Sequence, residues 1–415
     1  MNATTPSGAR SAHRRSCFPA LFALVATLVL SAFAPPLAAE ELWSDSGFFV
    51  DLPEGMYYAD GDGLTRFAFE DPSGRFTFQI ALYEPGRFPT AAAFRDGALR
   101  MLKAAGEAEL YVYQRREAFL GIIDFAAGGE PVSGFVFGVK GAVAGAGPAS
   151  GEPPPKDVLL LAYSAAGDFE SLAGFMLSCI DAFSIDAEAR LSPGPVAQFE
   201  RGSPSAVGSA VLSLGGKSFK FDYEVEDLAC AASVVDREFG VLSAYAEAEG
   251  ELAVAAWRRF YRMIARDSFR RVERLAFAIS RELGPALDPR ERAELLVRWT
   301  QGFTYERNLE GADFVNPLAA AVDGRGDCDS RALLVLLLLA HENIEGVLLV
   351  SSVHAHALAG LDVEGPGARF PWNGRDWLVA ETTDEVDLGL IDREMADPAD
   401  WLAVELPIWP VAYAE

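Results

Sequence analysis

The sequence predicts an α+β protein with two domains. Half of its 415 residues are hydrophobic, which is enough to form two or three cores. Some stretches alternate apolar and polar residues with the period of a strand, and others repeat with the period of a helix. Residues 187–207 have the proline, glycine and serine content of a linker, so we expect one domain over 40–186 and a second over 208–415.

Residues 1–39 have the layout of an export signal. Arg10, Arg14 and Arg15 precede an apolar run over 18–34, and small residues lead to Ala39, after which we expect cleavage. The sequence therefore predicts an exported protein, periplasmic or extracellular. Two alternatives stay open. Arg14-Arg15 could belong to a twin-arginine signal, and the segment could be an uncleaved anchor, because the apolar run approaches the length of a short membrane span.

The charge balance excludes several classes of partner. The formal net charge is −25, and removal of a signal with three arginines and no acidic residue makes it −28. A strongly acidic protein repels phosphate backbones and anionic lipid surfaces. We therefore expect no nucleic-acid partner, and contact with a membrane only through the signal segment if it stays uncleaved.

The first domain is predicted to be one α+β module. Its expected elements, in order, are a hairpin of strands 65–69 and 76–82, a helix over 90–105, strands over 110–113, 119–125, 135–139 and 158–163, and a helix over 169–183. The turn of the hairpin is set by Asp71-Pro72-Ser73-Gly74, and 141–156 is expected to be a flexible surface loop.

This element order, together with the phrase Gly-Phe-Phe-Val-Asp-Leu-Pro-Glu-Gly that begins at Gly47, resembles the Mog1/PsbP-like domains. The resemblance implies an α/β sandwich that serves in binding. No histidine lies between Ala39 and His341, so we expect no catalytic site in this domain.

The second domain is predicted to begin with a hairpin and continue mainly as helices. The expected elements are strands 211–214 and 219–223, then helices over 252–266 and 269–283, and a helix from Asp288 to Trp299 that begins with a capping box. The first two helices are rich in arginine: Arg258, Arg259, Arg262, Arg266, Arg270, Arg271 and Arg274. We expect solvated helix faces there; the alternative is a basic groove.

Four cysteines are present, and one has distinctive surroundings. Cys17 belongs to the signal, and Cys179 and Cys230 lie in apolar patterns typical of small core residues, although an oxidising compartment would also permit a disulfide between them. Cys328 lies between Gly326-Asp327 and Asp329, shortly before the apolar run 333–339, which is predicted to be a buried helix. It is the candidate nucleophile.

A thiol at the start of a helix is stabilised as a thiolate by the backbone N–H groups there. The neighbouring Asp327 and Asp329 oppose this effect, so a histidine has to supply the compensating positive charge. His354 and His356 follow a strand-like stretch and are two residues apart, so both are predicted to face the same side of one strand. Glu381 ends a second predicted strand and is placed to orient an imidazole.

These phrases resemble the transglutaminase-like superfamily, whose fold is related to papain. The matching parts are Gly326-Asp327-Cys328-Asp329 before a helix, His-Ala on a strand at His356, and a tryptophan-led strand that ends in Glu381-Thr382-Thr383, all within a core at 291–392. The resemblance implies a papain-like α+β domain in which Cys328 is the nucleophile, His356 the base and Glu381 the residue that orients it. His354, Asp327 and Asp329 are accessory candidates.

The sequence thus predicts an exported cysteine peptidase or amidase that acts on a protein or peptide substrate, with no cofactor and no metal. A first alternative is an inactive protein of the cell envelope that keeps this fold for interaction or substrate binding. A second is a zinc site formed by Cys328, His354, His356 and Glu381, all of which are ligand types that zinc accepts.

Overall fold

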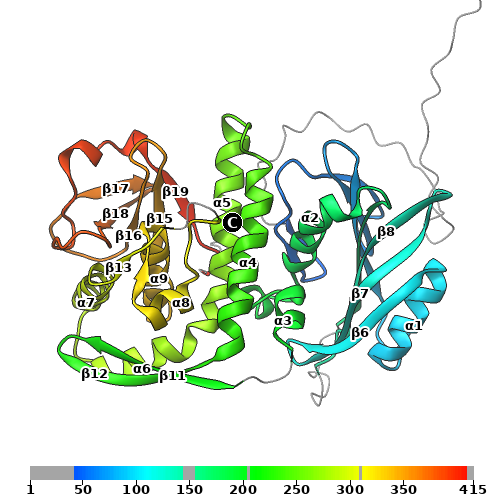
Figure 1. Ribbon diagram of the computed structural model, residues 1–415, viewed down its shortest axis with the longest axis horizontal. Helices are drawn as coiled ribbons and strands as arrows, with labels where there is room; N and C mark the ends of the chain where they lie inside the picture. The colour runs from blue at the N-terminus through cyan, green and yellow to red at the C-terminus, as the bar shows by residue number, and fades with distance from the viewer. Residues whose placement is uncertain (1–41, 144–154, 203–205, 308–310, 409–415) are drawn as a thin grey trace, which may run out of the picture.

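The computed structural model describes residues 42–143, 155–202, 206–307 and 311–408. The described chain has two α+β lobes, one on each side of the long helices α4 (Val225–Ser243) and α5 (Glu251–Arg271) (Figure 1). This confirms the predicted α+β class. No helix within these ranges is long and apolar enough to cross a membrane. The predicted export signal and most of the predicted loop at 141–156 lie outside the described residues.

The N-terminal lobe is organised on one antiparallel sheet of seven strands, in the order β3-β4-β5-β9-β8-β7-β6. Every strand predicted for this domain belongs to it. The strands are β3 (Tyr57–Gly61), β4 (Arg66–Glu70), β5 (Phe76–Tyr83), β6 (Ala105–Tyr113), β7 (Arg116–Ala127), β8 (Glu130–Val139) and β9 (Asp157–Ala165). A small second sheet consists of β1 (Leu42–Trp43), β2 (Phe49–Val50) and β10 (Phe183–Ser184).

The two predicted helices of this lobe cover opposite faces of the large sheet. Along β9, Leu159 and Leu161 pack in the core under α1 (Ala91–Leu102), whereas Val158 and Leu160 pack in the core under α2 (Phe169–Asp181). Because successive side chains of a strand point to opposite faces, β9 is buried on both sides. The lobe is therefore a sandwich of helix, sheet and helix.

Part of the predicted linker is helical and packed. Residues 187–207 contain the 3₁₀ helix η1 (Ala189–Leu191) and the short helix α3 (Pro195–Arg201). Ala189 and Val196 are buried in the core of the N-terminal lobe. The carboxylate of Asp181 accepts hydrogen bonds from the backbone N–H groups of Val196 at 2.9 Å and Ala197 at 3.0 Å, which fixes the start of α3.

The C-terminal lobe combines a helical layer with a five-stranded antiparallel sheet of order β17-β18-β16-β15-β19. Its helices after α5 are α6 (Glu273–Leu283), α7 (Pro289–Gln301), α8 (Pro317–Asp323) and α9 (Cys328–Ala340), and η2 (Arg393–Met395) and η3 (Pro398–Asp400) are 3₁₀ helices. The sheet consists of β15 (Gly346–Ser351), β16 (His356–Leu361), β17 (Arg369–Trp372), β18 (Arg375–Ala380) and β19 (Leu402–Glu405).

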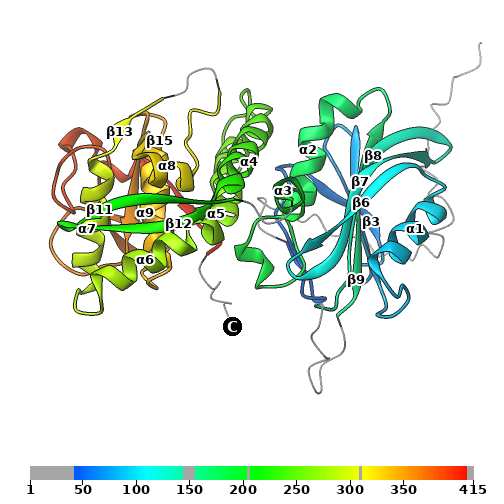
Figure 2. The same ribbon diagram turned by 60° about the horizontal axis from the view of Figure 1, so that its bottom comes forward.

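Two further strand pairs complete this lobe. The hairpin β11 (Val207–Leu214) and β12 (Lys217–Glu224) lies along α6 and α7 (Figure 2), and β13 (Thr304–Tyr305) pairs in parallel with β14 (Arg325–Gly326). The helix predicted over 269–283 begins only at Glu273, because α5 continues to Arg271. The predicted capping box is present, since Asp288 and Glu291 each accept a hydrogen bond from the other's backbone N–H.

The prediction of solvated arginine faces is wrong for three arginines of α5, whereas Arg270 is exposed. Arg259, Arg266 and Arg271 are buried, and they bind partners on several elements rather than water. Arg259 donates to the Glu238 carboxylate of α4 at 2.9 Å and to the Ser178 hydroxyl of α2 at 2.8 Å. The prediction failed because helical periodicity identifies a polar face but does not show which other element covers it.

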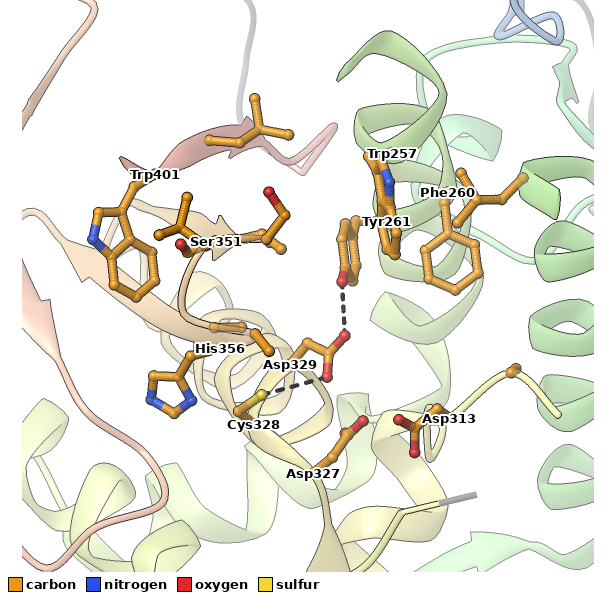
Figure 3. A pocket seen from close by; sticks show the side chains of 18 of the residues that line it. Trp257, Phe260, Tyr261, Asp313, Asp327, Cys328, Asp329, Ser351, His356 and Trp401 are labelled. Atoms are coloured by element: carbon orange, nitrogen blue, oxygen red, sulfur yellow. Dashed lines mark hydrogen bonds between the residues drawn. The ribbon is translucent and has the colours of Figure 1, made fainter. Parts of the chain in front are cut away.

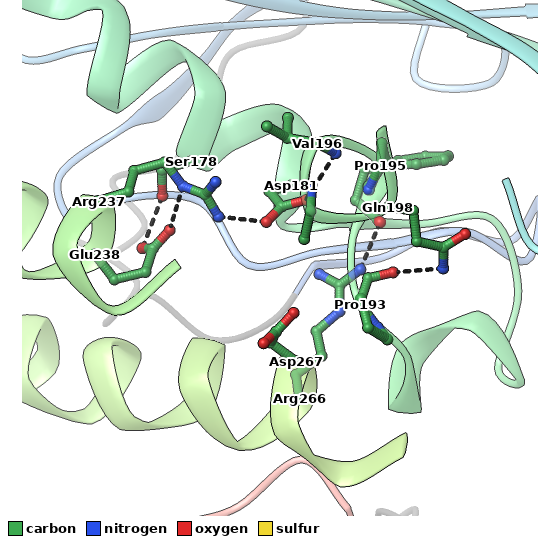
Figure 4. Close-up of polar contacts among 12 residues, drawn as sticks. Ser178, Asp181, Pro193, Pro195, Val196, Gln198, Arg237, Glu238, Arg266 and Asp267 are labelled. Carbon is green, nitrogen blue, oxygen red and sulfur yellow. Dashed lines mark hydrogen bonds and ion pairs between the residues drawn. The ribbon is translucent and has the colours of Figure 1, made fainter. Parts of the chain in front are cut away.

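This face of α4 and α5 joins the two lobes through paired charges. Arg262 binds both carboxylate oxygens of Asp51 at 2.8 Å, and Arg237 pairs with Asp181 (Figure 4). Burial opposes ionisation of Asp51, but the guanidinium of Arg262 keeps its pKa below the ordinary value. Ion pairs of α4 and α5 with Asp51 and Asp181 therefore cross the boundary between the lobes.

We predict that Arg259→Met lowers the free energy of unfolding by about 3–5 kcal/mol, because it leaves the buried Glu238 carboxylate without its guanidinium partner. The measurement is urea denaturation followed by tryptophan fluorescence. Arg270→Met is the matched control, since Arg270 makes only exposed ion pairs, worth about 0–1 kcal/mol. Equal losses in the two variants would contradict a structural role for the buried pair.

Candidate functional site

Cys328 is the first residue of α9, as the sequence predicted for the head of a buried helix. Asp327 is the N-cap, and its carboxylate accepts a hydrogen bond from the backbone N–H of Ser330 at 3.1 Å. Gly324 ends α8 in the left-handed conformation, at φ 63°, which allows the chain to turn toward Cys328 within four residues. The thiol itself is only 8% exposed.

Arg331 holds the loop in front of Cys328 in place. Its buried guanidinium donates to the backbone oxygens of Gly326 at 2.9 Å, Thr300 at 3.1 Å and Phe303 at 3.0 Å. These carbonyls belong to the loop before α9 and to the end of α7. One side chain thus ties the end of α7 to the loop before α9, which explains why an arginine is buried in this helix.

His356 and Glu381 come together because their strands are neighbours. β16 pairs antiparallel with β18, with Ala359 opposite Ala380, so the start of one strand lies beside the end of the other. The His356 Nε2 and Glu381 Oε2 atoms are 2.7 Å apart. The structure therefore brings these two predicted residues into direct contact.

The Glu381 carboxylate is held on both oxygens. Its Oε1 accepts hydrogen bonds from the backbone N–H of Thr383 at 2.7 Å and from the Thr383 hydroxyl at 2.5 Å. Burial raises the pKa of Glu381, but the contacts with His356 and Thr383 outweigh burial and leave it below the ordinary value. An ionised Glu381 only accepts, so Nε2 of His356 carries the hydrogen and Nδ1 is the free base.

The prediction that His354 and His356 share one face of a strand is wrong. His354 lies in the turn 352–355, where Ala355 takes a positive φ of 47°, and only His356 belongs to β16. The two imidazoles bind different carboxylates, since Nε2 of His354 is 3.2 Å from Oδ2 of Asp400. The ring of Trp401 lies near both, with centroids 5.7 Å from His354 and 6.4 Å from His356.

Cys328 and His356 line one cavity of about 780 Å³, which also contains the side chains of Asp327 and Asp329. Figure 3 shows His356 and Trp401 on one side of Cys328, and Tyr261 and Trp257 on the other. The cavity walls come from α4, α5, Tyr305, Arg307, residues 311–313, the start of α9, the turn after β15, and 399–402. Glu381 lies behind His356 and does not line the cavity.

The charges beside Cys328 favour the neutral thiol. Burial, followed by the carboxylates of Asp329 and Asp327, raises the pKa of the Cys328 thiol to about 12. The thiol donates a weak hydrogen bond to Oδ1 of Asp329 at 3.9 Å, and the other oxygen of that carboxylate accepts from the Tyr261 hydroxyl at 2.7 Å. The stabilisation expected from the helix start is thus outweighed by burial and by the two adjacent aspartates.

Asp327 is affected in the same way. Burial and the neighbouring Asp329 raise its pKa to about 8, which favours the protonated form of Asp327 at neutral pH. This arrangement keeps Asp327 as a hydrogen-bonding N-cap without adding a second full charge beside the thiol.

Several residues of the cavity were not identified from the sequence. Tyr261 and Trp257 lie on α5, and Asp400 and Trp401 lie near the C-terminal end. Tyr261 contacts a residue 68 positions away, and no motif links the two. In the sequence, Trp257 and Trp401 lie outside the hydrophobic runs, but this alone does not indicate that either residue lines a cavity.

The remaining cysteines and the zinc alternative are tested by the geometry. Cys179, Cys230 and Cys328 are free and buried, so the prediction of core residues is confirmed for the first two. Among the described residues, no three or more histidine, cysteine or acidic side chains are grouped closely enough to hold a metal ion. Because His354 turns toward Asp400, the four proposed zinc ligands do not converge.

No protein-family model and no curated protein matches the chain. Among solved structures, it is similar to the solution structure of cyanobacterial PsbP (CyanoP) from Synechocystis sp. PCC 6803, with 13% identity and a TM-score of 0.27, over 37% of this chain and 98% of that one. A crystal structure from Bacteroides thetaiotaomicron VPI-5482 has 10% identity and a TM-score of 0.25, over 57% of this chain and 80% of that one. The neighbours thus include a PsbP protein, but TM-scores this low assign no family.

We predict that Asp329→Asn accelerates alkylation of Cys328 by iodoacetamide at pH 8. Removal of the neighbouring negative charge lowers the pKa of the Cys328 thiol. The thiolate fraction at pH 8 rises roughly tenfold for each pKa unit by which the thiol pKa falls. Asparagine still accepts from Tyr261, so the local contacts persist. Alkylation is followed by mass spectrometry, with Asp376→Asn on exposed β18 as the control. An unchanged or slower rate in Asp329→Asn would show that the carboxylate does not restrain the thiol.

A second prediction concerns the pH dependence of stability. The pKa of Asp327 is raised on folding, so its contribution to stability is complete below about pH 4 and is lost as pH rises through about 8. Asp327→Asn keeps the N-cap but removes this titration. The free energy of unfolding of the native protein, minus that of the variant, should therefore fall between pH 4 and 8.

Urea denaturation across this pH range measures the difference, and Asp288→Asn, which replaces the exposed N-cap of α7, is the matched control. A difference that is constant, or that increases with pH, would contradict the protonated state of Asp327.

Proposed function

We propose that the C-terminal domain is a transglutaminase-like cysteine peptidase or amidase that cleaves peptide or carboxamide bonds. The observation that carries the proposal is the 2.7 Å contact between His356 and Glu381, which gives the imidazole a free Nδ1 in the same cavity as Cys328. A nucleophile, a base and a carboxylate that orients the base are the three parts that acyl transfer requires. The substrate would be a protein or peptide outside the cytoplasm, in keeping with the predicted export signal.

The chemistry would proceed in two steps. Nδ1 of His356 takes the proton of the Cys328 thiol as Sγ attacks the carbonyl carbon, and the backbone N–H of Cys328 at the helix start stabilises the oxyanion. His356 then returns the proton to the leaving amine, and a thioester forms as the C–N bond breaks. A water molecule, deprotonated by His356, hydrolyses the thioester and regenerates the thiol.

The raised pKa of Cys328 selects one form of this mechanism. A preformed thiolate–imidazolium pair is not favoured, because burial, Asp329 and Asp327 all disfavour the thiolate. Proton transfer to His356 is therefore expected to accompany attack, as in a serine hydrolase. Glu381 stabilises the imidazolium that forms in that step.

The alternative is a binding protein that retains the fold without catalysis. The same pKa of about 12 favours it, because a thiol that stays neutral is a poor nucleophile. In that case the cavity would bind a peptide without cleaving it, and substitution of Cys328 would leave the function intact.

The test uses the protein without its first 39 residues and a mixed peptide pool, with new N-termini identified by mass spectrometry and ammonia release measured separately. We expect Cys328→Ala and His356→Ala to lose turnover, and Glu381→Gln to lower the rate by roughly 10²–10⁴-fold, because the imidazole loses its orientation and charge partner. His354→Asn is the matched control, since His354 binds Asp400 and not Glu381. Turnover that persists in Cys328→Ala, or that is absent from the native protein, would exclude the proposed enzyme.

A further inference from the structure

One wall of the cavity is apolar and comes from the two helices between the lobes. Phe239 and Leu242 of α4 and Val254, Trp257 and Phe260 of α5 all line it. Phe260 is buried, whereas Trp257 remains 42% exposed although its ring stacks at 5.9 Å on Tyr261. One face of the Trp257 ring is covered by the Tyr261 ring, and the exposed remainder offers a large apolar surface to a ligand.

The position of His356 determines which part of a substrate meets this wall. The proton that His356 takes from Cys328 goes to the leaving amine, so the amine has to lie on the His356 side of the thiol. Tyr261 and Trp257 lie on the opposite side (Figure 3), and the contacts of Cys328 with Asp329 and of Asp329 with Tyr261 connect that side to the thiol. The acyl part of the substrate is therefore directed toward α5.

The charges of the cavity restrict that acyl part further. Asp313, Asp329 and Asp400 line the cavity, and Arg307, the one lining cation in the described part of the chain, is bound to Asp313 at 2.8 Å. These carboxylates would repel a negatively charged substrate side chain. Among the described residues, the cavity has no free cation to pair with such a side chain. An uncharged apolar side chain is not repelled by the carboxylates and needs no cation to pair with.

We propose that the cavity selects substrates whose acyl-side residue is large and apolar, aromatic or branched aliphatic, and that Trp257 is the main determinant of this specificity. The inference rests on the proposed function for the direction of the substrate. The wall itself lies outside the 291–392 core, in helices that the N-terminal lobe supports from behind through Arg259 and Arg262.

Binding to Cys328→Ala separates specificity from chemistry. The probes are acetylated tetrapeptide amides, Ac-Gly-X-Gly-Gly-NH₂, in which X is Phe, Leu, Ala or Glu, and affinity is measured by isothermal titration calorimetry. We expect Phe and Leu to bind at least tenfold more tightly than Ala, in line with the roughly 10–200-fold that small apolar differences give in enzyme pockets, and Glu to bind more weakly than Ala.

Adding Trp257→Ala should remove most of the preference for Phe over Ala. Trp257 is partly exposed, so this variant is expected to fold. The matched control is Trp43→Ala, which removes a similarly exposed tryptophan from the N-terminal lobe and should preserve the preference. Affinity that is independent of X, or a preference for Phe that survives Trp257→Ala, would overturn the proposal.

The same peptides separate this inference from the proposed enzyme. Selective binding by Cys328→Ala, with no turnover by the native protein, would support the apolar subsite and refute the hydrolase. Turnover by the native protein with equal kcat/KM for Phe, Ala and Glu would support the hydrolase and refute the subsite.

Discussion

The buried ion pairs on α4 and α5 are the constraint on which the rest of the structure depends. Arg259 and Glu238 are removed from water at the boundary between the lobes, and desolvation of such charges costs several kcal/mol per ion unless each finds its partner. Because Asp51 and Ser178 supply contacts from the N-terminal lobe, the two domains satisfy each other's polar groups. The helices that separate the lobes are thereby fixed in position, and the cavity beside Cys328 has a rigid wall.

The candidate site combines opposing electrostatic effects. The two oxygens of Glu381 are fully engaged, by His356 and by Thr383, so the orientation of the imidazole is set before any substrate arrives. The thiol is restrained instead, since burial and Asp329 favour its neutral form. An oriented imidazole beside a thiol that is kept protonated fits the proposed mechanism, in which proton transfer would occur only during attack.

The sequence predicted the parts of this protein that depend on local pattern. Alternation identified β4, β5, β7, β8 and β9, the capping box located the start of α7, and the glycine-flanked Cys328 was correctly placed at the head of a buried helix. The contact of His356 with Glu381 was expected from the strand pattern that ends at Glu381 together with the family resemblance at His356. Two local features were missed: helix α4, and the turn that separates His354 from His356, in which Ala355 takes a positive φ that alanine rarely adopts. The burial of Arg259 under the N-terminal lobe is a long-range contact and has no local signal.

The two faces of α5 have a consequence for how sequence change is tolerated. Residues 259, 262 and 266 face the N-terminal lobe, whereas 254, 257 and 260 face the cavity, and both sets follow the helical repeat. Neighbouring positions along this one helix therefore meet different physical requirements, since one set joins the lobes and the other lines the cavity. A substitution at 254 or 257 would therefore change the cavity wall and leave in place the contacts that join the domains.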